Sequence, residues 1–210
     1  MRRPEFIARQ SACPSGILGR LLGRIMAAET ASANRIAVDL LGVRAPDHVL
    51  EIGFGHGATI ARLATRASRG WVAGVDVSVA MLHMATRRNR DHIARGRVEL
   101  QQARAEDLPY SSGRFHRALS MHTLYFWPEP RGILAEVRRV LGPGGRFVLG
   151  WRADPDAVRQ FPEPTYRFHD DESVEEMLTT AGFCRLRVTR ERVGRATLHF
   201  AVGETPATAL

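Results

Sequence analysis

The stretch VLEIGFGHG, Val49 to Gly57, places a short apolar run that ends in a carboxylate directly before three glycines at alternate positions. The apolar run, residues 49–52, predicts a buried strand, and residues 58–67 predict a helix. A glycine turn between a strand and a helix presents backbone N–H groups at the carboxyl edge of a sheet, where nucleotide-like ligands bind in open α/β folds. Because glycine has no β-carbon, the turn lets a ligand approach the backbone. The stretch therefore predicts a ligand site in an α/β fold.

Strand and helix patterns alternate along the chain after this turn. Strand patterns follow at 71–75, 98–101, 115–120 and 146–151, with helix patterns at 78–88 and 131–141. This alternation predicts a Rossmann-like, doubly wound sheet with parallel strands and helices on both faces. A helix at 171–181 then precedes two β-rich runs, 183–190 and 196–202, whose short connection permits only an antiparallel hairpin. We expect a seven-stranded, mostly parallel α/β sheet with a reversed C-terminal strand.

The chain divides into three expected parts around this core. Apolar residues between Ile17 and Leu41 recur at helical spacing, with a break expected around residues 29–32. We therefore expect an N-terminal helical part at residues 1–45, a core at 46–203 and a loose tail at 204–210.

Composition limits the class of protein and its partners. The 210 residues are 44% hydrophobic, enough for one domain with a sizeable core. The net charge is +8, yet every one of the 30 basic residues is Arg and they are scattered, which favours a solvated basic surface over a nucleic-acid patch. Cys13 and Cys184 are too few for a disulfide framework, and the longest apolar stretches are too short to span a bilayer. These features predict a cytoplasmic protein without a membrane span.

Two carboxylates near the glycine turn indicate the kind of ligand. Asp76 ends the second strand 19 residues after Gly57, the position from which a carboxylate binds ribose hydroxyls. Gly53, Gly55 and Ala58 also fit a dinucleotide fingerprint, so the glycines alone leave NAD open. Glu51 would face a pyrophosphate unfavourably but suits a ligand with an ammonium or sulfonium group. A purely structural Glu51 that caps backbone N–H groups stays open as well.

At this point the sequence resembles a known family, the class I S-adenosylmethionine-dependent methyltransferases of the small-molecule branch called type 11. VLEIGFGHG resembles the family's first motif, GVDVS (residues 74–78) its acidic second-strand end, and AEDLPY (105–110) its adenine-contacting segment. RVLGPGGRFVL (139–149) resembles the segment before its fifth strand. The resemblance covers about residues 14 to 203, with the motifs in the usual order and spacing.

The resemblance implies roles for eleven cofactor-binding residues and a lid. Glu51 would lie near the amino group of S-adenosylmethionine, and Asp76 would hold the ribose hydroxyls. The remaining residues would lie under the methionine part and ribose (Gly53, Phe54, Gly55), beside the adenine face (Val77, Met81), at the adenine edge (Ala105, Glu106) and beside the sulfonium (Ser120, Met121). The helices of residues 1–45 would fold over the ligand as a lid.

Three positions depart from the family's pattern. Arg104 stands where the family usually carries an Asp toward the adenine amino group. His116 replaces the frequent Asp after the aromatic residue of the fourth strand, and His56 lies in the glycine turn where Pro, Thr or Ser is usual. These departures concern how the cofactor is held, and Glu106 or a backbone carbonyl is the expected substitute for the missing Asp.

The segment SMHTLYFWP, residues 120–128, follows the fourth strand at the edge where a methyl group would project. His122 is the candidate general base, because its ordinary pKa lies near the working range, although a structural histidine is an equal alternative. Tyr125 is the second catalytic candidate, and with Phe126 and Trp127 it supplies aromatic surface for an acceptor or a sulfonium, or else for the core. Tyr166 and His169 lie in another expected rim loop. The histidines and cysteines show no metal-ligand spacing, so no metal is expected.

These observations lead to one leading function and several alternatives. The leading function is methyl transfer from S-adenosylmethionine to a small organic acceptor, at O, N or C, by in-line displacement that leaves S-adenosylhomocysteine. The alternatives are a methyltransferase of RNA or protein, a non-catalytic module that binds S-adenosylmethionine, and an NAD-dependent oxidoreductase. The expected partner is a small-molecule substrate and not nucleic acid, and the expected state is a monomer or homodimer.

Overall fold

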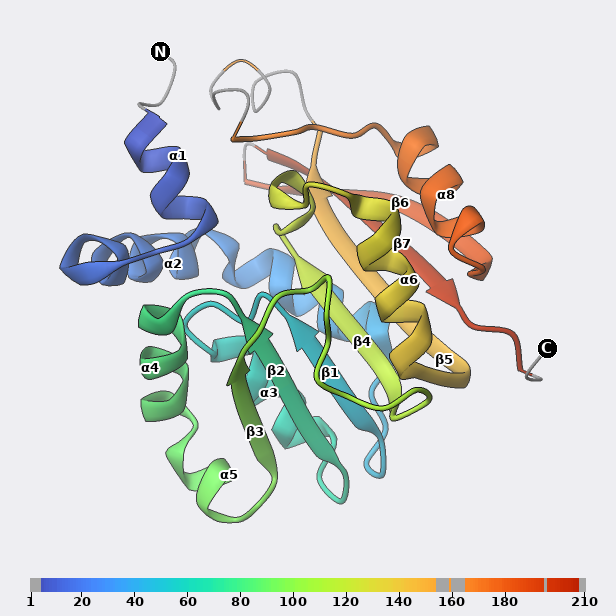
Figure 1. Ribbon diagram of the computed structural model, residues 1–210, viewed down its shortest axis with the longest axis horizontal. Coiled ribbons are helices and arrows are strands. Elements are labelled where there is room, and N and C mark those ends of the chain that lie inside the picture. Colours follow the sequence, from blue (N-terminus) through green and yellow to red (C-terminus); the bar gives the residue numbers. More distant parts are fainter. Residues whose placement is uncertain (1–4, 154–158, 160–164, 195, 208–210) are drawn as a thin grey trace.

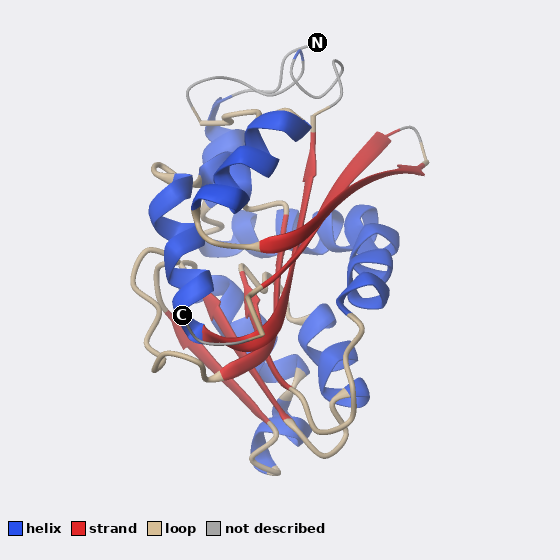
Figure 2. Cartoon of the chain, turned by 90° about the vertical axis from the view of Figure 1, so that its right-hand side faces the viewer, coloured by secondary structure: helices blue, strands red, loops and turns tan. Residues whose placement is uncertain are grey.

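The computed structural model describes residues 5–153, 159, 165–194 and 196–207. It consists of one twisted sheet between two layers of helices (Figures 1 and 2). The strands are β1 (His48–Ile52), β2 (Trp71–Asp76), β3 (Val98–Gln102), β4 (Phe115–Met121), β5 (Leu141–Arg152), β6 (Cys184–Val193) and β7 (Ala196–Glu204). The expected α/β class is confirmed.

The order of the strands creates a crevice at the middle of the sheet. The order is β3-β2-β1-β4-β5-β7-β6, so the chain moves outward from β1 to β3 and then returns to pair β4 with β1. Strands β1 to β5 are parallel, whereas β7 runs antiparallel to both β5 and β6. The predicted reversed strand and hairpin are therefore confirmed. Ligands of open α/β sheets bind where the direction of winding changes, which is here between β1 and β4.

The helices cover the two faces of the sheet with separate apolar cores. They are α1 (Glu5–Ala12), α2 (Gly16–Leu41), α3 (Ala58–Arg66), α4 (Val79–Arg88), α5 (Arg90–Ala94), the 3-10 helix η1 (Leu124–Phe126), α6 (Pro130–Val140) and α8 (Asp171–Thr180). One core packs α2, α3 and α4 against one face, and the other packs α6 and α8 against the opposite face. In both α3 and α6, apolar side chains at helical spacing face the sheet, as their sequences predict.

The N-terminal segment differs in detail from the expectation. The break expected around residues 29–32 was wrong, because α2 is a continuous helix of 26 residues. Residues 27–33, AAETASA, contain no Gly or Pro, and their four Ala residues favour a helix, so nothing local interrupts the backbone there. The helix ends at Gly42, which takes the left-handed conformation at φ +63°. No helix among the described residues is both long enough and apolar enough to cross a membrane.

The C-terminal part of the chain supplies the last two strands at one edge of the sheet. Thr205, within the expected loose tail, is buried, and its hydroxyl accepts a hydrogen bond from Gly145 N at 2.8 Å and donates one to Gly142 O. The ordered chain therefore reaches at least this residue. Strand β6 forms the outer edge of the sheet, and four arginines on it are exposed: Arg185, Arg187, Arg190 and Arg192.

Candidate active site

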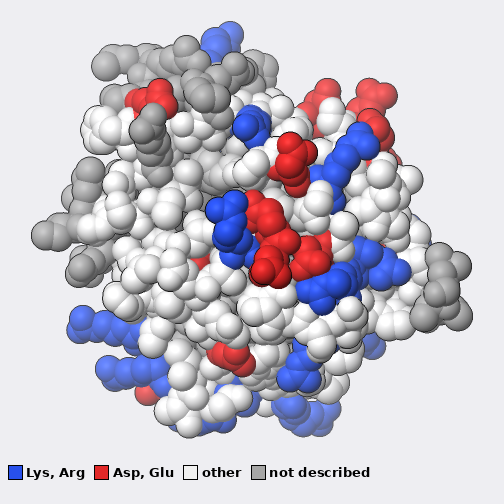
Figure 3. Space-filling view, viewed as in Figure 1, with Lys and Arg blue, Asp and Glu red and all other residues white. Residues whose placement is uncertain are grey.

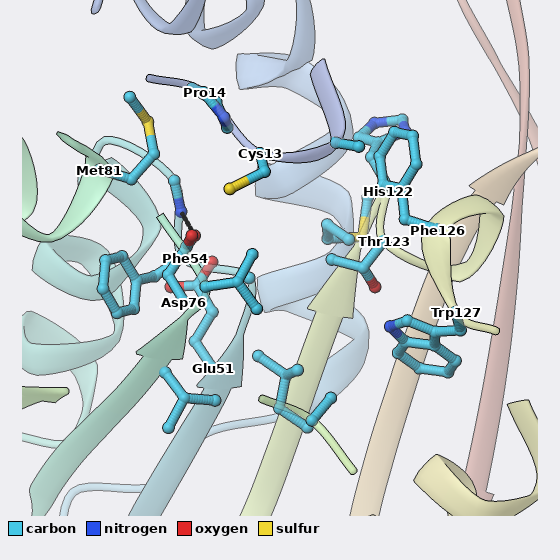
Figure 4. A pocket seen from close by; sticks show the side chains of 18 of the residues that line it. Cys13, Pro14, Glu51, Phe54, Asp76, Met81, His122, Thr123, Phe126 and Trp127 are labelled. Carbon is cyan, nitrogen blue, oxygen red and sulfur yellow. Dashed lines mark hydrogen bonds between the residues drawn. The ribbon is translucent and has the colours of Figure 1, made fainter. Parts of the chain in front are cut away.

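A cavity of about 420 Å³ lies at the carboxyl ends of β1, β2 and β4, where the strand order predicts a ligand (Figure 4). Eleven of the thirteen predicted site residues line it: Glu51, Gly53, Phe54, Gly55, Asp76, Val77, Met81, Ala105, Glu106, Met121 and His122. Ser120 and Tyr125 do not line it. Segments far apart in the sequence therefore meet at one site.

The three glycines of the turn serve different purposes. All three take positive φ, at +77° for Gly53, +53° for Gly55 and +79° for Gly57. Residues with a side chain rarely adopt this backbone conformation. A β-carbon on Gly53 would lie 2.3 Å from Thr123 Cγ2, and one on Gly57 would lie 2.7 Å from the Ala85 side chain. Only a β-carbon on Gly55 would meet open space. The expectation that every glycine makes room for a ligand thus holds for Gly55 alone, whereas the other two make room for the protein itself.

Asp76 ties the end of β2 to the glycine turn. Its Oδ2 accepts a hydrogen bond from Gly55 N at 2.8 Å, and its Oδ1 accepts one from Ser78 N at 2.9 Å. Burial raises the pKa of this carboxyl, and the two backbone hydrogen bonds oppose that rise. The carboxylate therefore holds the turn in place while one side of it faces the cavity.

Glu51 presents an unsatisfied carboxyl to the same cavity. The residue is 3% exposed, and its Oε2 is buried without a hydrogen-bond partner. Burial raises the pKa of Glu51 well above its ordinary value of 4.5, the negative charge of Asp76 raises it further, and a hydrogen bond from Thr59 lowers it. Two carboxyls in one buried space favour a ligand that brings positive charge.

His122 faces the cavity from the opposite side, directly after β4. It is one of two described non-glycine residues with positive φ, at +59°, and its N–H donates to Gly150 O at 2.8 Å. Its Nδ1 lies 3.2 Å from the Tyr125 hydroxyl, and its Nε2 is buried without a hydrogen-bond partner. Burial, and then the charge of Arg152, lower the pKa of His122 to about 4. The imidazole is therefore uncharged at neutral pH and can accept a proton.

Thr123 joins the two sides of the cavity. Its methyl group fills the space that the missing β-carbon of Gly53 leaves open. Its hydroxyl lies 2.6 Å from the Ser120 hydroxyl, which in turn donates to Ile52 O at 3.0 Å. Sequence reasoning placed Ser120 beside the sulfonium and gave Thr123 no role. The contact between Thr123 and Gly53 links residues 70 positions apart, so it leaves no local pattern in the sequence.

The aromatic residues after β4 divide between cavity and core. Phe126 and Trp127 line the cavity (Figure 4), whereas Tyr125 packs behind them against the Tyr166 and Phe168 rings, each at 5.5 Å between centroids. The two rim candidates, Tyr166 and His169, do not line the cavity. Tyr166 is 5% exposed and belongs to the apolar core.

The end of α1 and the turn that leads to α2 cover the cavity. Cys13 and Pro14 lie above the Asp76 side of the site (Figure 4), and Ser11 and Ala12 complete this strap, residues 11–14. The Ser78 hydroxyl donates to Pro14 O and accepts a hydrogen bond from Met81 N, so the cap of α4 also holds the strap. The resemblance to the family implied a covering segment here, but no pattern in the sequence identified this contact.

The departures from the family pattern occupy different places. Arg104 and Glu106 line the cavity and form an ion pair at 3.0 Å. His56 also lines it, and burial followed by the charge of Arg88 lowers its pKa. His116 lies at the other end of the sheet, where its Nδ1 accepts a hydrogen bond from His48 N at 2.9 Å. The change at His116 therefore does not touch the site.

No group of three or more His, Cys, Asp or Glu residues within the described part of the chain is placed to hold a metal ion.

Comparisons with known proteins agree with this geometry. A family model described as a methyltransferase domain matches residues 50–149. The protein named uncharacterized methyltransferase YdaC, from Bacillus subtilis (strain 168), is 30% identical over 148 residues, which cover 70% of this chain and 78% of that protein. The 27-O-demethylrifamycin SV methyltransferase of Amycolatopsis mediterranei (strain S699) is 33% identical over 123 residues, 59% of this chain and 44% of that protein.

Solved structures share the fold. A structure described as a SAM dependent methyltransferase from Aquifex aeolicus matches with a TM-score of 0.66 and 20% identity, over 81% of this chain and 88% of that one. The [4+2]-cyclase SpnF matches with a TM-score of 0.71 and 17% identity, over 97% and 93% of the two chains. Since one fold accommodates proteins of such different names, the fold alone does not assign the acceptor.

Proposed function

This chain belongs to the class I S-adenosylmethionine-dependent methyltransferases, and from that premise we propose that its methyl acceptor is a small organic molecule. Methylation would occur at O, N or C by in-line displacement. Relatives support the small acceptor by their names, which include a 27-O-demethylrifamycin SV methyltransferase and a demethylmenaquinone methyltransferase from Tropheryma whipplei, 33% identical over 64% of this chain and 53% of that protein.

The residues of the cavity fit the cofactor. The unpaired Oε2 of Glu51 offers a buried negative partner to an amino or sulfonium group, and Asp76 stands where ribose hydroxyls are bound. Open space at Gly55 admits a ligand to the backbone. We assign the other contacts as the sequence predicts, to Gly53, Phe54, Val77, Met81, Ala105, Glu106 and Met121. Ser120 would act through Thr123, because its hydroxyl is engaged by Ile52 and Thr123.

When bound, S-adenosylmethionine supplies an electrophilic methyl group: the S–CH₃ bond breaks while the acceptor–CH₃ bond forms, and the sulfonium becomes a neutral thioether. The protein's contribution is alignment and exclusion of water, which the strap and the aromatic wall provide. Where the acceptor atom carries a proton, His122 Nε2 would receive it, a role supported by its position in the cavity lining. Tyr125 would orient the His122 ring through the contact with Nδ1.

One observation carries this proposal: two buried carboxyls and one uncharged imidazole face each other across a single cavity. The carboxyls suit a cationic donor, and the imidazole suits a protic acceptor. NAD is disfavoured, because its pyrophosphate would have to enter beside the buried carboxyl of Glu51.

Isothermal titration calorimetry of the purified protein with S-adenosylmethionine, S-adenosylhomocysteine and NAD tests the cofactor site. We expect micromolar binding of the first two and none of NAD. Asp76→Asn should weaken this binding at least about tenfold. The matched control is Asp91→Asn, since Asp91 is exposed on α5 and pairs only with Arg90.

Binding of NAD without S-adenosylmethionine would refute the proposal at the level of the cofactor. Binding of S-adenosylmethionine that Asp76→Asn leaves unchanged would refute the assigned site. Methylation of RNA or of a protein, with no turnover of small organic molecules, would refute the proposed acceptor class.

A further inference from the structure

The lining of the cavity divides into a charged side and an uncharged side. The charged side chains among the described lining residues lie on β1, β2 and the segment after β3: Glu51, Asp76, Arg104 and Glu106. The wall from the N-terminal helices, the strap, the end of β4 and the segment after it contributes Ser, Ala, Cys, Pro, Thr, Asn, Met, His, Phe and Trp side chains. Apart from that of Met121, the cofactor roles assigned above fall on or beside the first side, so most of the second side remains for the acceptor.

The uncharged side carries unpaired polar atoms. His122 Nε2 and Asn34 Oδ1 are buried without hydrogen-bond partners. Trp127 also lines the cavity, with its indole nitrogen directed toward Thr123 and the cavity (Figure 4). Buried polar atoms normally have partners, and an unmade hydrogen bond costs about 1–3 kcal/mol. These atoms therefore indicate a ligand that supplies hydrogen-bonding groups.

The same side offers no compensation for a charge on the acceptor. His122 is uncharged at neutral pH, because burial and the charge of Arg152 lower its pKa to about 4. Arg152 itself is not part of the cavity lining. An acceptor carboxylate or phosphate would meet the aromatic wall and face Glu51 and Asp76 across the cavity. An ammonium would find no carboxylate on this side among the described residues and, in the complex, would lie beside the positively charged sulfonium.

The volume adds a limit on size. About 420 Å³ lies near the lower end of the range of about 300–1,000 Å³ for ligand sites, and the cofactor must share it with the acceptor. Phe126 and Trp127 present ring surface to this space, which favours apolar and planar groups.

We propose that the acceptor is a small, uncharged molecule, largely apolar, whose hydroxyl or other protic group binds His122 Nε2 against the Phe126 and Trp127 wall. This inference rests on the proposed function and narrows it. In the reaction the acceptor's O–H bond breaks, the proton moves to His122 Nε2, and the oxygen takes the methyl group. A phenol or enol suits this step best, because an acidic hydroxyl gives up its proton readily.

Three probes with one ring system and different charge test the proposal: 2-naphthol, 2-naphthoate and protonated 2-(aminomethyl)naphthalene. Their binding is measured by calorimetry at neutral pH with the protein saturated by S-adenosylhomocysteine. Methylation of 2-naphthol by S-adenosylmethionine is followed by mass spectrometry. We expect 2-naphthol to bind at least about tenfold tighter than either charged probe and to become O-methylated.

The variant His122→Asn removes Nε2 while keeping a residue that tolerates positive φ. It should lose at least about tenfold in 2-naphthol affinity. Trp127→Phe should lose less, because the phenyl ring keeps an aromatic surface at this position. The control is His83→Asn on the exposed side of α4. Thermal unfolding of each variant identifies any that fail to fold. If His122→Asn does not fold, the loss of 2-naphthol affinity in Trp127→Phe is the test.

Equal or tighter binding of a charged probe would overturn the proposal, as would 2-naphthol affinity unchanged in both His122→Asn and Trp127→Phe. Absence of probe binding while S-adenosylhomocysteine binds would also overturn it, leaving the proposed function intact. Failure of S-adenosylhomocysteine itself to bind would instead refute the proposed function.

Discussion

Glu51 illustrates how a residue can serve binding at the expense of stability. Its carboxyl is buried beside Asp76, and one of its oxygens has no partner. Because its pKa is raised in the folded protein, the folded state holds a proton that the unfolded state releases above about pH 4.5. The residue therefore costs stability as pH rises from its ordinary pKa toward its raised one. A cationic ligand removes that cost by neutralising the ionised carboxylate.

We predict that Glu51→Gln raises the thermal midpoint of the ligand-free protein at neutral pH and weakens S-adenosylmethionine binding by at least about tenfold. The amide keeps the shape and the contact with Thr59 but cannot ionise. Differential scanning calorimetry with and without the cofactor measures both effects. The stabilisation should vanish near pH 4, where Glu51 in the folded protein is protonated and therefore as uncharged as the Gln side chain of the variant. A Gln variant that is less stable at neutral pH would contradict the interpretation.

His122 makes the opposite contribution to pH dependence. Its folded pKa of about 4 lies below its ordinary value of 6.5, so the unfolded chain binds a proton more readily than the folded protein. We predict that stability falls between about pH 6.5 and 4, with up to about 3 kcal/mol of this loss due to His122. His122→Asn should show a smaller fall in urea unfolding over this range. An identical fall in both proteins would show that other histidines, such as His56, carry the effect.

Much of the candidate site could be predicted residue by residue, and the reason is local. Asp76 and Glu51 end strands, and His122 follows one, so each is marked by its position in a strand-and-turn pattern. Thr123 and the strap gave no such signal. Thr123 matters because it lies against Gly53, and the strap matters because Pro14 O meets the Ser78 hydroxyl. Contacts between distant segments follow from packing, and sequence periodicity contains no information about them.

At the scale of elements, the turn after β1 and the segment after β4 form one unit. Gly53→Ala should destabilise the protein both by its positive φ and by the contact of its β-carbon with Thr123 Cγ2. Thr123→Ser removes that methyl group and keeps the hydroxyl near Ser120. We predict a coupling of at least about 1 kcal/mol between the two substitutions in urea unfolding.

The matched control for this cycle is Gly55→Ala with Thr123→Ser. Gly55 has a similar positive φ, but its β-carbon would meet open space. These two substitutions should be additive within about 0.5 kcal/mol. Equal coupling in both cycles would mean that backbone strain alone, and not the contact with Thr123, explains the destabilisation.

Within the described part of the chain, the Ser78 hydroxyl joins the strap to α4. We predict that Ser78→Ala raises the dissociation rate of S-adenosylmethionine by about tenfold in stopped-flow displacement, because the strap loses its anchor to the cofactor side. Asp170→Ala removes a comparable helix cap from α8, away from the cavity, and should leave the rate unchanged. A similar rate increase in both variants would point to general destabilisation.

Elements followed from the sequence better than their boundaries did. The strands, the crossover helices and the terminal hairpin were all marked by periodicity and by connection length. The continuous α2 was not, because a polar stretch within a helix resembles a break in the sequence, and the place of Thr30 in the cavity lining leaves no periodic signal. The short helices α1 and α5 were missed, since eight and five residues hold too little periodic signal.

At the scale of the whole molecule, the charge of +8 is spread over a surface that also carries acidic groups. Figure 3 shows basic and acidic side chains side by side on one face. Among the ion pairs of the described residues, Arg139 pairs with Glu136 at 2.7 Å and Arg131 pairs with Glu176 at 2.9 Å. Such pairing offsets part of the positive charge.

We predict that S-adenosylhomocysteine affinity changes less than about threefold between about 50 and 500 mM salt, since its partners are buried. Any affinity for a mixed tRNA sample should fall by at least about a hundredfold over the same range, because exposed arginines alone would carry it. Fluorescence anisotropy and calorimetry measure the two quantities. tRNA affinity that persists at high salt would favour the RNA methyltransferase alternative.

The arginines of β6 have a consequence for colloidal behaviour. An edge strand displays N–H and C=O groups that can join another sheet and start aggregation. Here that edge carries Arg185, Arg187, Arg190 and Arg192, all exposed, on ten residues. Arg185 pairs with Glu204 and Arg190 with Asp171, which reduces the charge that these two present. When two such edges approach, Arg187 and Arg192 bring like charges together before any backbone hydrogen bond forms. We expect this part of the basic excess to slow the pairing of one open sheet with another.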